Sequence, residues 1–207
     1  MTISRPLLYL ASHSPRRREL LRQINVRFET LLLRSDLVRG SDVEEIPRDG
    51  EAPTDYVNRV TVDKARIGAV RARERGLAPG VVLAADTEVV IDGEALGKPR
   101  DAAAATRMLL RLSGRSHEVL SAVAVATSET RIDVRLTRSV VTLKELEPAE
   151  LRRYVSSGEP LDKAGSYAIQ GIGALFVTRI EGSYSAVMGL PLYETGELLR
   201  SSGFDIP

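Results

Sequence analysis

A run of serines and arginines near the start of the chain has the residue types of a phosphate-binding site. It extends from Ser12 to Arg18, and a proline follows Ser14. Serine is a favourable N-cap and proline suits the first helical position, so we predict a helix that begins here with free N–H groups able to attract an anion. Because Arg16 in the first turn opposes the helix dipole, we expect it to contact a phosphate. Arg17 and Arg18 are expected on the solvated face.

A second candidate is Asp86, which follows the apolar run from Val81 to Ala85. A short apolar run of this kind predicts a buried strand. Ligands of open α/β sheets bind beyond the carboxyl ends of such strands. A carboxylate in that position, followed by Thr87, can hold Mg²⁺ or orient a water molecule. The alternative is that Asp86 only caps a turn.

Lysine is scarce in this chain, which draws attention to the positions where it occurs. Among 29 basic residues, lysine stands only at positions 64, 98, 144 and 163. Lys98 lies in a loop with glycine and proline, where simple solvation is the alternative. Lys64 lies on a partly apolar stripe of a predicted helix. It either snorkels to solvent or reaches into a cleft, and both interpretations stay open.

A glycine-rich segment from Gly158 to Gly171 contains Lys163 and Gln170. Lys163 suits a phosphate or an aspartate partner, and the amide of Gln170 can read the edge of a nucleobase. The alternative is a simple turn between a helix and a strand. Cations clustered with carboxylates are what chemistry on a metal-bound polyphosphate requires, so the segments together favour phosphoryl chemistry.

The elements that would position these residues alternate between helices and strands. Apolar periodicity and capping residues predict helices over 15–23, 54–75, 101–112, 148–155 and 191–202. The same reading predicts strands over 7–11, 28–33, 81–85, 89–91, 117–126, 133–143 and 174–180. Asp92-Gly93 predicts a type I′ hairpin turn, and residues 39–55 are predicted to be a loop. The fold class is therefore mixed α/β.

Composition narrows the class of protein. A chain of 207 residues predicts one domain, or one domain with two lobes. With no cysteine, disulfides and thiolate metal sites are excluded. The net charge of +1 and the aromatic fraction of 4% argue against nucleic-acid binding. The absence of a signal-like N-terminus and of a long apolar run predicts a cytoplasmic protein with no membrane association. His13 and His117 are too few for a metal cage, and His117 is expected to be structural.

The segment from Leu10 to Leu21 resembles the opening signature of the Maf family of nucleoside triphosphate pyrophosphatases. Later blocks are similar to the family in the right order, over 56–65, 85–87, 96–101, 112–117, 162–173 and 180–192. Together these blocks cover nearly the whole chain, and an ordered series of this length is highly specific.

The resemblance implies a fold and a reaction. The fold is the two-lobed α/β fold of inosine triphosphate pyrophosphatases, with a bent mixed β-sheet and a central cleft, here as a single domain over residues 1–207. The reaction is hydrolysis of the α–β phosphoanhydride of a nucleoside triphosphate, which gives a nucleoside monophosphate and pyrophosphate. The implied cofactor is a divalent metal cation, Mg²⁺ or Mn²⁺, and a homodimer is plausible from the family.

The resemblance also assigns roles to residues. Asp86 corresponds to the family's proton acceptor, and Glu44 lies where the family has a metal-site acid. We expect Glu44 and Asp86 to hold the metal together; the sequence does not separate the roles of base and ligand for Asp86. Arg16, Thr87 and Gln170 occupy substrate-selectivity positions. The implied substrate-binding residues are Ser12, Arg16, Lys64, Thr87, Lys98, Lys163 and Gln170.

The pair Asp162-Lys163 with Gln170 is similar to the branch that hydrolyses dTTP and UTP, so these nucleotides, or modified pyrimidine nucleotides, are the expected substrates. One alternative is a pyrophosphatase for N7-methylguanine nucleotides. Another is a nucleotide-sensing regulator of cell division and septum formation. The chain departs from the branch at His13 and Ala168 and in a longer loop over 34–42.

Overall fold

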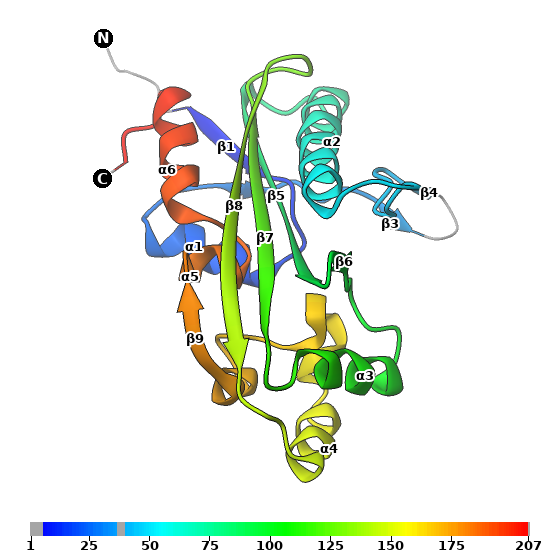
Figure 1. Ribbon diagram of the computed structural model, residues 1–207. Helices are drawn as coiled ribbons and strands as arrows, with labels where there is room; N and C mark the ends of the chain where they lie inside the picture. The colour runs from blue at the N-terminus through cyan, green and yellow to red at the C-terminus, as the bar shows by residue number, and fades with distance from the viewer. Residues whose placement is uncertain (1–5, 37–39, 207) are drawn as a thin grey trace.

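One mixed β-sheet runs through the computed structural model (Figure 1), which describes residues 6–36 and 40–206. Within those residues, seven strands pair in the order β2-β1-β5-β7-β8-β9, with β6 joined to β5. Their bounds are β1 Leu7–Leu10, β2 Glu29–Thr30, β5 Gly80–Ile91, β6 Glu94–Ala95, β7 Ser116–Ala126, β8 Ile132–Leu143 and β9 Val177–Glu181. Strand β1 is parallel to β2 and β5, and the other pairs are antiparallel. The predicted mixed α/β class is confirmed.

Helices cover both faces of the sheet and one end of its long strands (Figure 1). The α-helices are α1 Pro15–Gln23, α2 Pro53–Glu74, α3 Ala102–Leu112, α4 Pro148–Ser156, α5 Tyr184–Met188 and α6 Leu192–Ser201. Three 3₁₀ turns follow α4: η1 Glu159–Asp162, η2 Ala164–Ser166 and η3 Ile172–Phe176. A separate short hairpin is formed by β3 Ser35–Asp36 and β4 Gly40–Ser41. None of the helices in the described part of the chain has the length and apolar character needed to cross a membrane.

Burial of β1 on both faces of the sheet explains why its sequence is a continuous apolar run. Leu8 and Leu10 are buried against α1 and α6, whereas Tyr9 and Ala11 are buried on the opposite face, against α2. A strand that is covered on both faces has no polar alternation. A further apolar cluster, which includes Leu109 and Tyr154, closes the end of the long strands near α3 and α4. The core therefore supports both ends of the sheet.

Local sequence signals account for several element boundaries. Helix α1 spans Pro15–Gln23 as predicted, although Ser14 makes no side-chain capping bond. Asp101 caps α3, because its Oδ1 accepts a hydrogen bond from Ala104 N at 2.7 Å. Asp92 and Gly93 have φ values of 54° and 78°, as a type I′ turn requires. These predictions are confirmed.

The predicted break in the strand at Asp86 was wrong. Strand β5 continues from Gly80 to Ile91 because β7 pairs with it antiparallel from Val82 to Val90. The pairing of β1 with β5 ends at Leu10 and Leu83. Asp86 therefore lies in the middle of β5 but beyond the end of β1, the neighbouring strand. The crevice outside the sheet is the one beyond the carboxyl end of β1.

Other predicted bounds differ from the structure. Strand β2 covers only Glu29–Thr30, and residues 172–176 form the 3₁₀ turn η3 before β9 begins. Part of the predicted loop over 39–55 forms β4, which pairs with β3. The first residue of that predicted loop, residue 39, lies outside the described residues.

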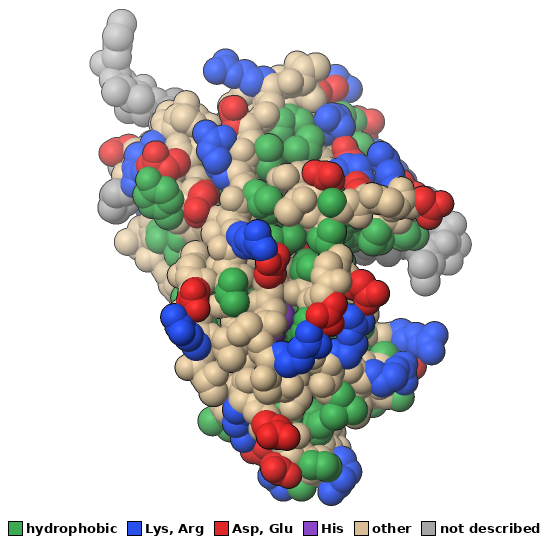
Figure 2. Space-filling model, viewed as in Figure 1, with side chains coloured by type: hydrophobic (Ala, Val, Ile, Leu, Met, Phe, Trp, Pro, Cys, Tyr) green, Lys and Arg blue, Asp and Glu red, His purple; other side chains and the backbone are tan. Residues whose placement is uncertain are grey.

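Positive and negative side chains are interspersed over the face seen in Figure 2.

Candidate active site

The predicted site residues converge on one cavity of about 380 Å³, a size typical of small-molecule sites. The loop after β1, the first turn of α1, α2, the middle of β5 and the segment around η1 and η2 form its walls. The predicted residues that line it are Ser12, Arg16, Lys64, Asp86, Thr87, Lys98, Lys163 and Gln170. Glu44 is the predicted site residue that is not part of this lining.

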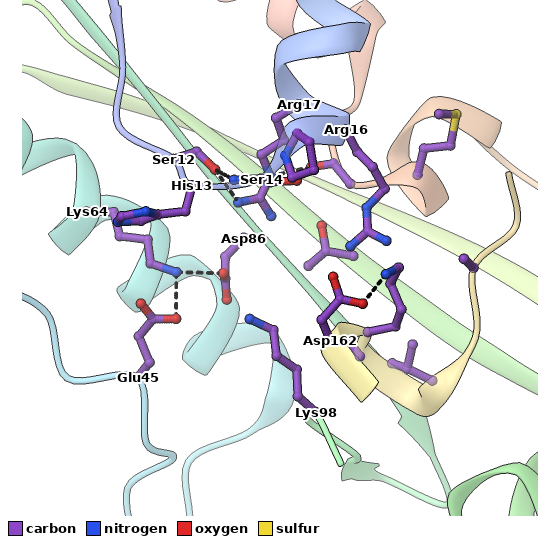
Figure 3. A pocket seen from close by; sticks show the side chains of 18 of the residues that line it. Ser12, His13, Ser14, Arg16, Arg17, Glu45, Lys64, Asp86, Lys98 and Asp162 are labelled. Atoms are coloured by element: carbon purple, nitrogen blue, oxygen red, sulfur yellow. Dashed lines mark hydrogen bonds and ion pairs between the residues drawn. The ribbon is translucent and has the colours of Figure 1, made fainter. Parts of the chain in front are cut away.

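Lys64 joins two carboxylates at the centre of the cavity (Figure 3). Its Nζ lies 2.8 Å from Asp86 Oδ1 and 2.8 Å from Glu45 Oε2. The Lys64 side chain is only 11% exposed. Between the two interpretations of Lys64, the structure supports a lysine that reaches from α2 into a cleft, since its ammonium ends on the Asp86 carboxylate rather than in bulk solvent.

The structure places Glu45, rather than Glu44, beside Asp86. Val43 and Glu45 line the cavity, whereas the Glu44 side chain is 66% exposed and its carboxylate lies 3.9 Å from Arg48. The side chains of these two consecutive glutamates therefore point to different places, and only that of Glu45 faces the cavity. Glu45, rather than Glu44, is therefore the acid that lies beside Asp86 in the cavity, and the metal-site expectation for Glu44 stays a prediction.

Helix α2 fixes the backbone of the segment that carries Glu45. Tyr56 Oη donates to the Glu45 carbonyl at 3.1 Å. Arg59 donates to the carbonyls of Glu44 and Ile46 at 3.2 and 3.0 Å. These hydrogen bonds from α2 hold the backbone on both sides of Glu45. The Glu45 side chain is thereby directed towards Lys64, which is also on α2.

Arg17 was expected on the solvated face, and this expectation was wrong. Its Nε donates to the Gly189 carbonyl at 2.8 Å and its NH1 to Ser12 Oγ at 3.2 Å. Burial lowers the pKa of Arg17, and the nearby Asp86 carboxylate opposes that shift. The side chain links the first turn of α1 to the end of α5 and brings a guanidinium to the cavity lining. The signal in the sequence is its place in the same first turn as Arg16. Arg18 is not part of the lining.

Arg16 has the environment expected of an anion-binding arginine. Its Nε is buried and has no hydrogen-bond partner among the described residues. Burial lowers the pKa of Arg16, while the carboxylates of Asp162 and Glu159 act in the opposite direction. A buried N–H without an acceptor is costly, so an oxygen of a bound anion would satisfy it. The predicted phosphate contact fits this position.

Lys98 is placed by a buried carboxylate that sequence reasoning missed. Glu88 Oε1 accepts hydrogen bonds from Gly97 N at 2.7 Å and Val89 N at 3.2 Å. Gly97 has a φ of 59°, a conformation that favours glycine. Its carbonyl accepts from Gly165 N at 2.9 Å. The loop is thus held from both sides, and Figure 3 shows Lys98 pointing towards the space beside Asp86.

Lys163 pairs with its neighbour Asp162, as the Asp-Lys motif suggested, and both residues line the cavity. The Asp162 side chain is 72% exposed, whereas that of Lys163 is 14% exposed. Burial would raise the pKa of Asp162, but the hydrogen bond and charge of Lys163, together with the charge of Arg16 and a backbone hydrogen bond, outweigh it and lower the pKa. The pair supplies a cation to the cavity, and Figure 3 shows Asp162 on the other side of the cavity from Lys64 of α2.

The remaining wall of the cavity is largely apolar. Tyr167, Ala168 and Ile169 are buried and precede the exposed Gln170, and all four residues line the cavity. Thr87 completes the lining on β5, where its Oγ1 lies 3.1 Å from Ser121 Oγ. An apolar surface with an amide at its edge suits a planar ring that carries polar edge groups.

The two histidines have separate places. His13 lines the cavity, and its Nε2 lies 2.9 Å from the Leu33 carbonyl, which accepts its hydrogen. His117 is buried outside the lining, with Nε2 2.8 Å from Tyr167 Oη, and burial lowers its pKa to about 4. His117 is therefore neutral and structural, as predicted.

Comparisons with known proteins agree with the resemblance of the sequence blocks. The chain is 49% identical over 199 residues to the dTTP/UTP pyrophosphatase of Nitrosomonas europaea. The aligned residues make up 96% of each of the two chains. It is 53% identical over 201 residues to the protein of the same name from Burkholderia pseudomallei, covering 96% of this chain and 95% of the relative.

A solved structure shares the fold and a family model matches the sequence. The HAM1 protein of Coxiella burnetii superposes with a TM-score of 0.51 at 16% identity, over 95% of this chain and 99% of that one. This likeness supports the predicted two-lobed fold class alone. The family model described as Maf-like protein matches residues 7–202. The chain therefore belongs to the Maf family.

Proposed function

We propose that the protein hydrolyses nucleoside triphosphates, with dTTP and UTP preferred, to nucleoside monophosphates and pyrophosphate. The observation that carries the proposal is the Asp86 carboxylate, held at 2.8 Å by Lys64 in a cavity whose other walls carry arginine and lysine. The names of the relatives at about 50% identity over nearly the full length support the same substrates.

Asp86 is proposed as the proton acceptor. One of its carboxylate oxygens, Oδ1, accepts from Lys64, and the other can accept a proton from water. The water oxygen forms a bond to the α-phosphorus while the bond from the α-phosphorus to the bridging oxygen breaks. Pyrophosphate leaves with the electron pair, so the products are one nucleoside monophosphate and one pyrophosphate.

The positive side chains are proposed to bind the triphosphate and to stabilise charge on the leaving pyrophosphate. Arg16 contributes a buried, unpartnered Nε, and Lys98 and Lys163 lie on other walls of the same cavity. Fixed cations that face the position of developing negative charge lower the barrier most in a site with little water. Ser12, bonded to Arg17, belongs to the same wall.

The chemistry of the carboxylates fits a divalent metal. Asp86 and Glu45 both approach Lys64 Nζ at 2.8 Å, so two negatively charged groups converge on one small region. Mg²⁺ is commonly bound by one or two carboxylates together with substrate phosphates. We infer that these two residues would hold Mg²⁺ or Mn²⁺, which would supply further neutralisation of the phosphate oxygens.

Gln170 and Thr87 are proposed to read the pyrimidine. The amide of Gln170 offers both a donor and an acceptor, and the buried side chains of Tyr167 and Ile169 offer an apolar surface to the ring. The expectations of a cytoplasmic enzyme, of a homodimer and of no nucleic-acid partner stay predictions.

The experiment is a screen of purified protein against canonical and modified nucleoside triphosphates. Pyrophosphate and orthophosphate are measured separately, with Mg²⁺, Mn²⁺ or EDTA. We expect pyrophosphate release that is fastest with dTTP and UTP and is abolished by EDTA. Release of orthophosphate, or a preference for N7-methylguanine nucleotides, would overturn the assignment. Binding without turnover would favour a nucleotide sensor.

A further inference from the structure

The wall that carries Gln170 has little regular structure to hold it in place. Residues 167–170 lie between η2 and η3 and belong to no strand. Yet these residues line the cavity, and Gln170 is the proposed reader of the base. Discrimination between nucleobases requires side-chain positions that are fixed to a fraction of an ångström, so some other contact has to fix this backbone.

Two side chains from outside the cavity supply that contact. Glu159 Oε2 accepts from Ile172 N at 2.9 Å, and its Oε1 accepts from Gly173 N at 2.9 Å. Tyr154 Oη donates to Glu159 Oε1 at 2.9 Å and accepts from Ala168 N at 3.2 Å. The backbone is therefore held on both sides of Gln170, and neither Tyr154 nor Glu159 lines the cavity.

The two side chains are themselves fixed. Tyr154 is buried, and its ring packs edge-on against Phe176 with centroids 4.9 Å apart. Burial would raise the pKa of Glu159, but the hydrogen bonds from Gly173, Ile172 and Tyr154 outweigh it and lower the pKa. Glu159 is thus ionised at neutral pH and accepts all three bonds.

Close packing leaves room only for glycine beside this pair. A Cβ at Gly173 would lie 2.8 Å from Tyr154 Oη, and a Cβ at Gly171 would overlap the Glu159 carboxylate. Because Glu159 is held by three donors, it cannot move aside without losing them. Gly171 and Gly173, on either side of Ile172, are therefore required by the close contact of this backbone with Tyr154 and Glu159.

We propose that Tyr154 and Glu159 are positioning residues that set nucleobase selectivity by fixing the wall that carries Gln170. The inference rests on the proposed function, because it concerns which nucleotide that reaction accepts. Neither residue touches the substrate; both act through the backbone of residues 168–173.

The test is the Tyr154→Phe variant, which removes one hydroxyl and keeps the ring that packs on Phe176. Its matched control is Tyr9→Phe, because the Tyr9 hydroxyl likewise makes a hydrogen bond to the backbone, donating to the Ala78 carbonyl at 2.9 Å, but Tyr9 does not line the cavity. The ratio of kcat/KM for UTP to that for CTP is measured by pyrophosphate release. We expect this ratio to fall about five- to tenfold in Tyr154→Phe and to stay unchanged in Tyr9→Phe.

A double variant separates positioning from general loss of structure. If Tyr154 acts through Gln170, Tyr154→Phe lowers the UTP/CTP ratio in the wild-type background but has no further effect in Gln170→Ala. Additive losses in the double variant, or an unchanged ratio in Tyr154→Phe, would overturn the inference. A wild-type protein that releases no pyrophosphate from any nucleotide would instead refute the proposed function, so the two failures are distinguishable.

Discussion

The Nζ of Lys64 lies 2.8 Å from Oδ1 of Asp86, so a cation from helix α2 meets the carboxylate on strand β5 across the cavity. The contact keeps one carboxylate oxygen occupied and orients the other. It also joins α2 to β5, the next element along the chain, and it makes the proposed chemistry of Asp86 dependent on α2.

Asp86→Asn is expected to lower kcat for dTTP by about 10²-fold or more, because the amide cannot accept the proton of the attacking water. The measurement is steady-state pyrophosphate release. Asp133→Asn is the matched control, since Asp133 is exposed on β8 and outside the cavity lining. A wild-type rate in Asp86→Asn would remove Asp86 from its proposed role.

Glu45→Gln and Glu44→Gln form a pair of matched variants. Only Glu45 contacts Lys64 in the cavity, so we expect Glu45→Gln to raise the Mg²⁺ concentration for half-maximal activity by about tenfold. Glu44→Gln should leave it unchanged within error. The opposite result would restore Glu44 as the metal-site acid.

Arg17→Lys keeps the positive charge but cannot make both bonds to Ser12 and Gly189. We expect a fall of about 1–2 kcal/mol in the free energy of unfolding and a higher KM for the nucleotide. Urea unfolding and initial-rate kinetics check the two effects. Arg18→Lys, one residue along the same helix, should change neither; equal effects in both variants would contradict the inward role of Arg17.

Glu88 predicts a pH dependence of stability. Burial raises the pKa of Glu88 from its ordinary value of 4.5 to about 7, so the folded protein holds this proton more tightly than the unfolded chain. Its contribution to the free energy of unfolding is complete below pH 4.5 and is lost as the pH rises through about 7. The loss amounts to about 3 kcal/mol at most.

Urea unfolding of wild type and Glu88→Gln at several values between pH 5 and pH 8 tests this dependence. The glutamine does not titrate, so the decline with pH should be smaller in Glu88→Gln by the amount due to Glu88. Glu145→Gln, which changes an exposed carboxylate, should follow the wild type. Parallel curves for wild type and Glu88→Gln would show that Glu88 does not titrate in this range.

Local signals predicted the elements that depend on local chemistry. The proline that opens α1, the Asp101 cap and the Asp92-Gly93 turn each act within a few residues, and each was placed correctly. The continuity of β5 past Asp86 was missed because it depends on pairing with β7, which lies about thirty residues further along the chain. Tertiary pairing outweighed the polar interruption.

The site was predicted as a set of residues but not as a geometry. The lysines and Asp86 were found because their types are unusual in their contexts. The choice of Glu45 over Glu44 depends on which of the two side chains faces Lys64 on α2, and the inward turn of Arg17 depends on a carbonyl at Gly189. Neither partner, Lys64 for Glu45 or Gly189 for Arg17, is adjacent in sequence, so the pattern of residues does not show which side chain meets which partner.

The proposed proton acceptor and the proposed nucleobase reader have different supports. Asp86 lies in a continuous strand that β7 pairs from Val82 to Val90, whereas Gln170 lies on irregular backbone held by side chains. Substitutions around Gln170 can therefore alter which ring is accepted and leave Asp86 where it is. An evolving lineage can acquire new substrates on this scaffold while it inherits the hydrolytic centre unchanged.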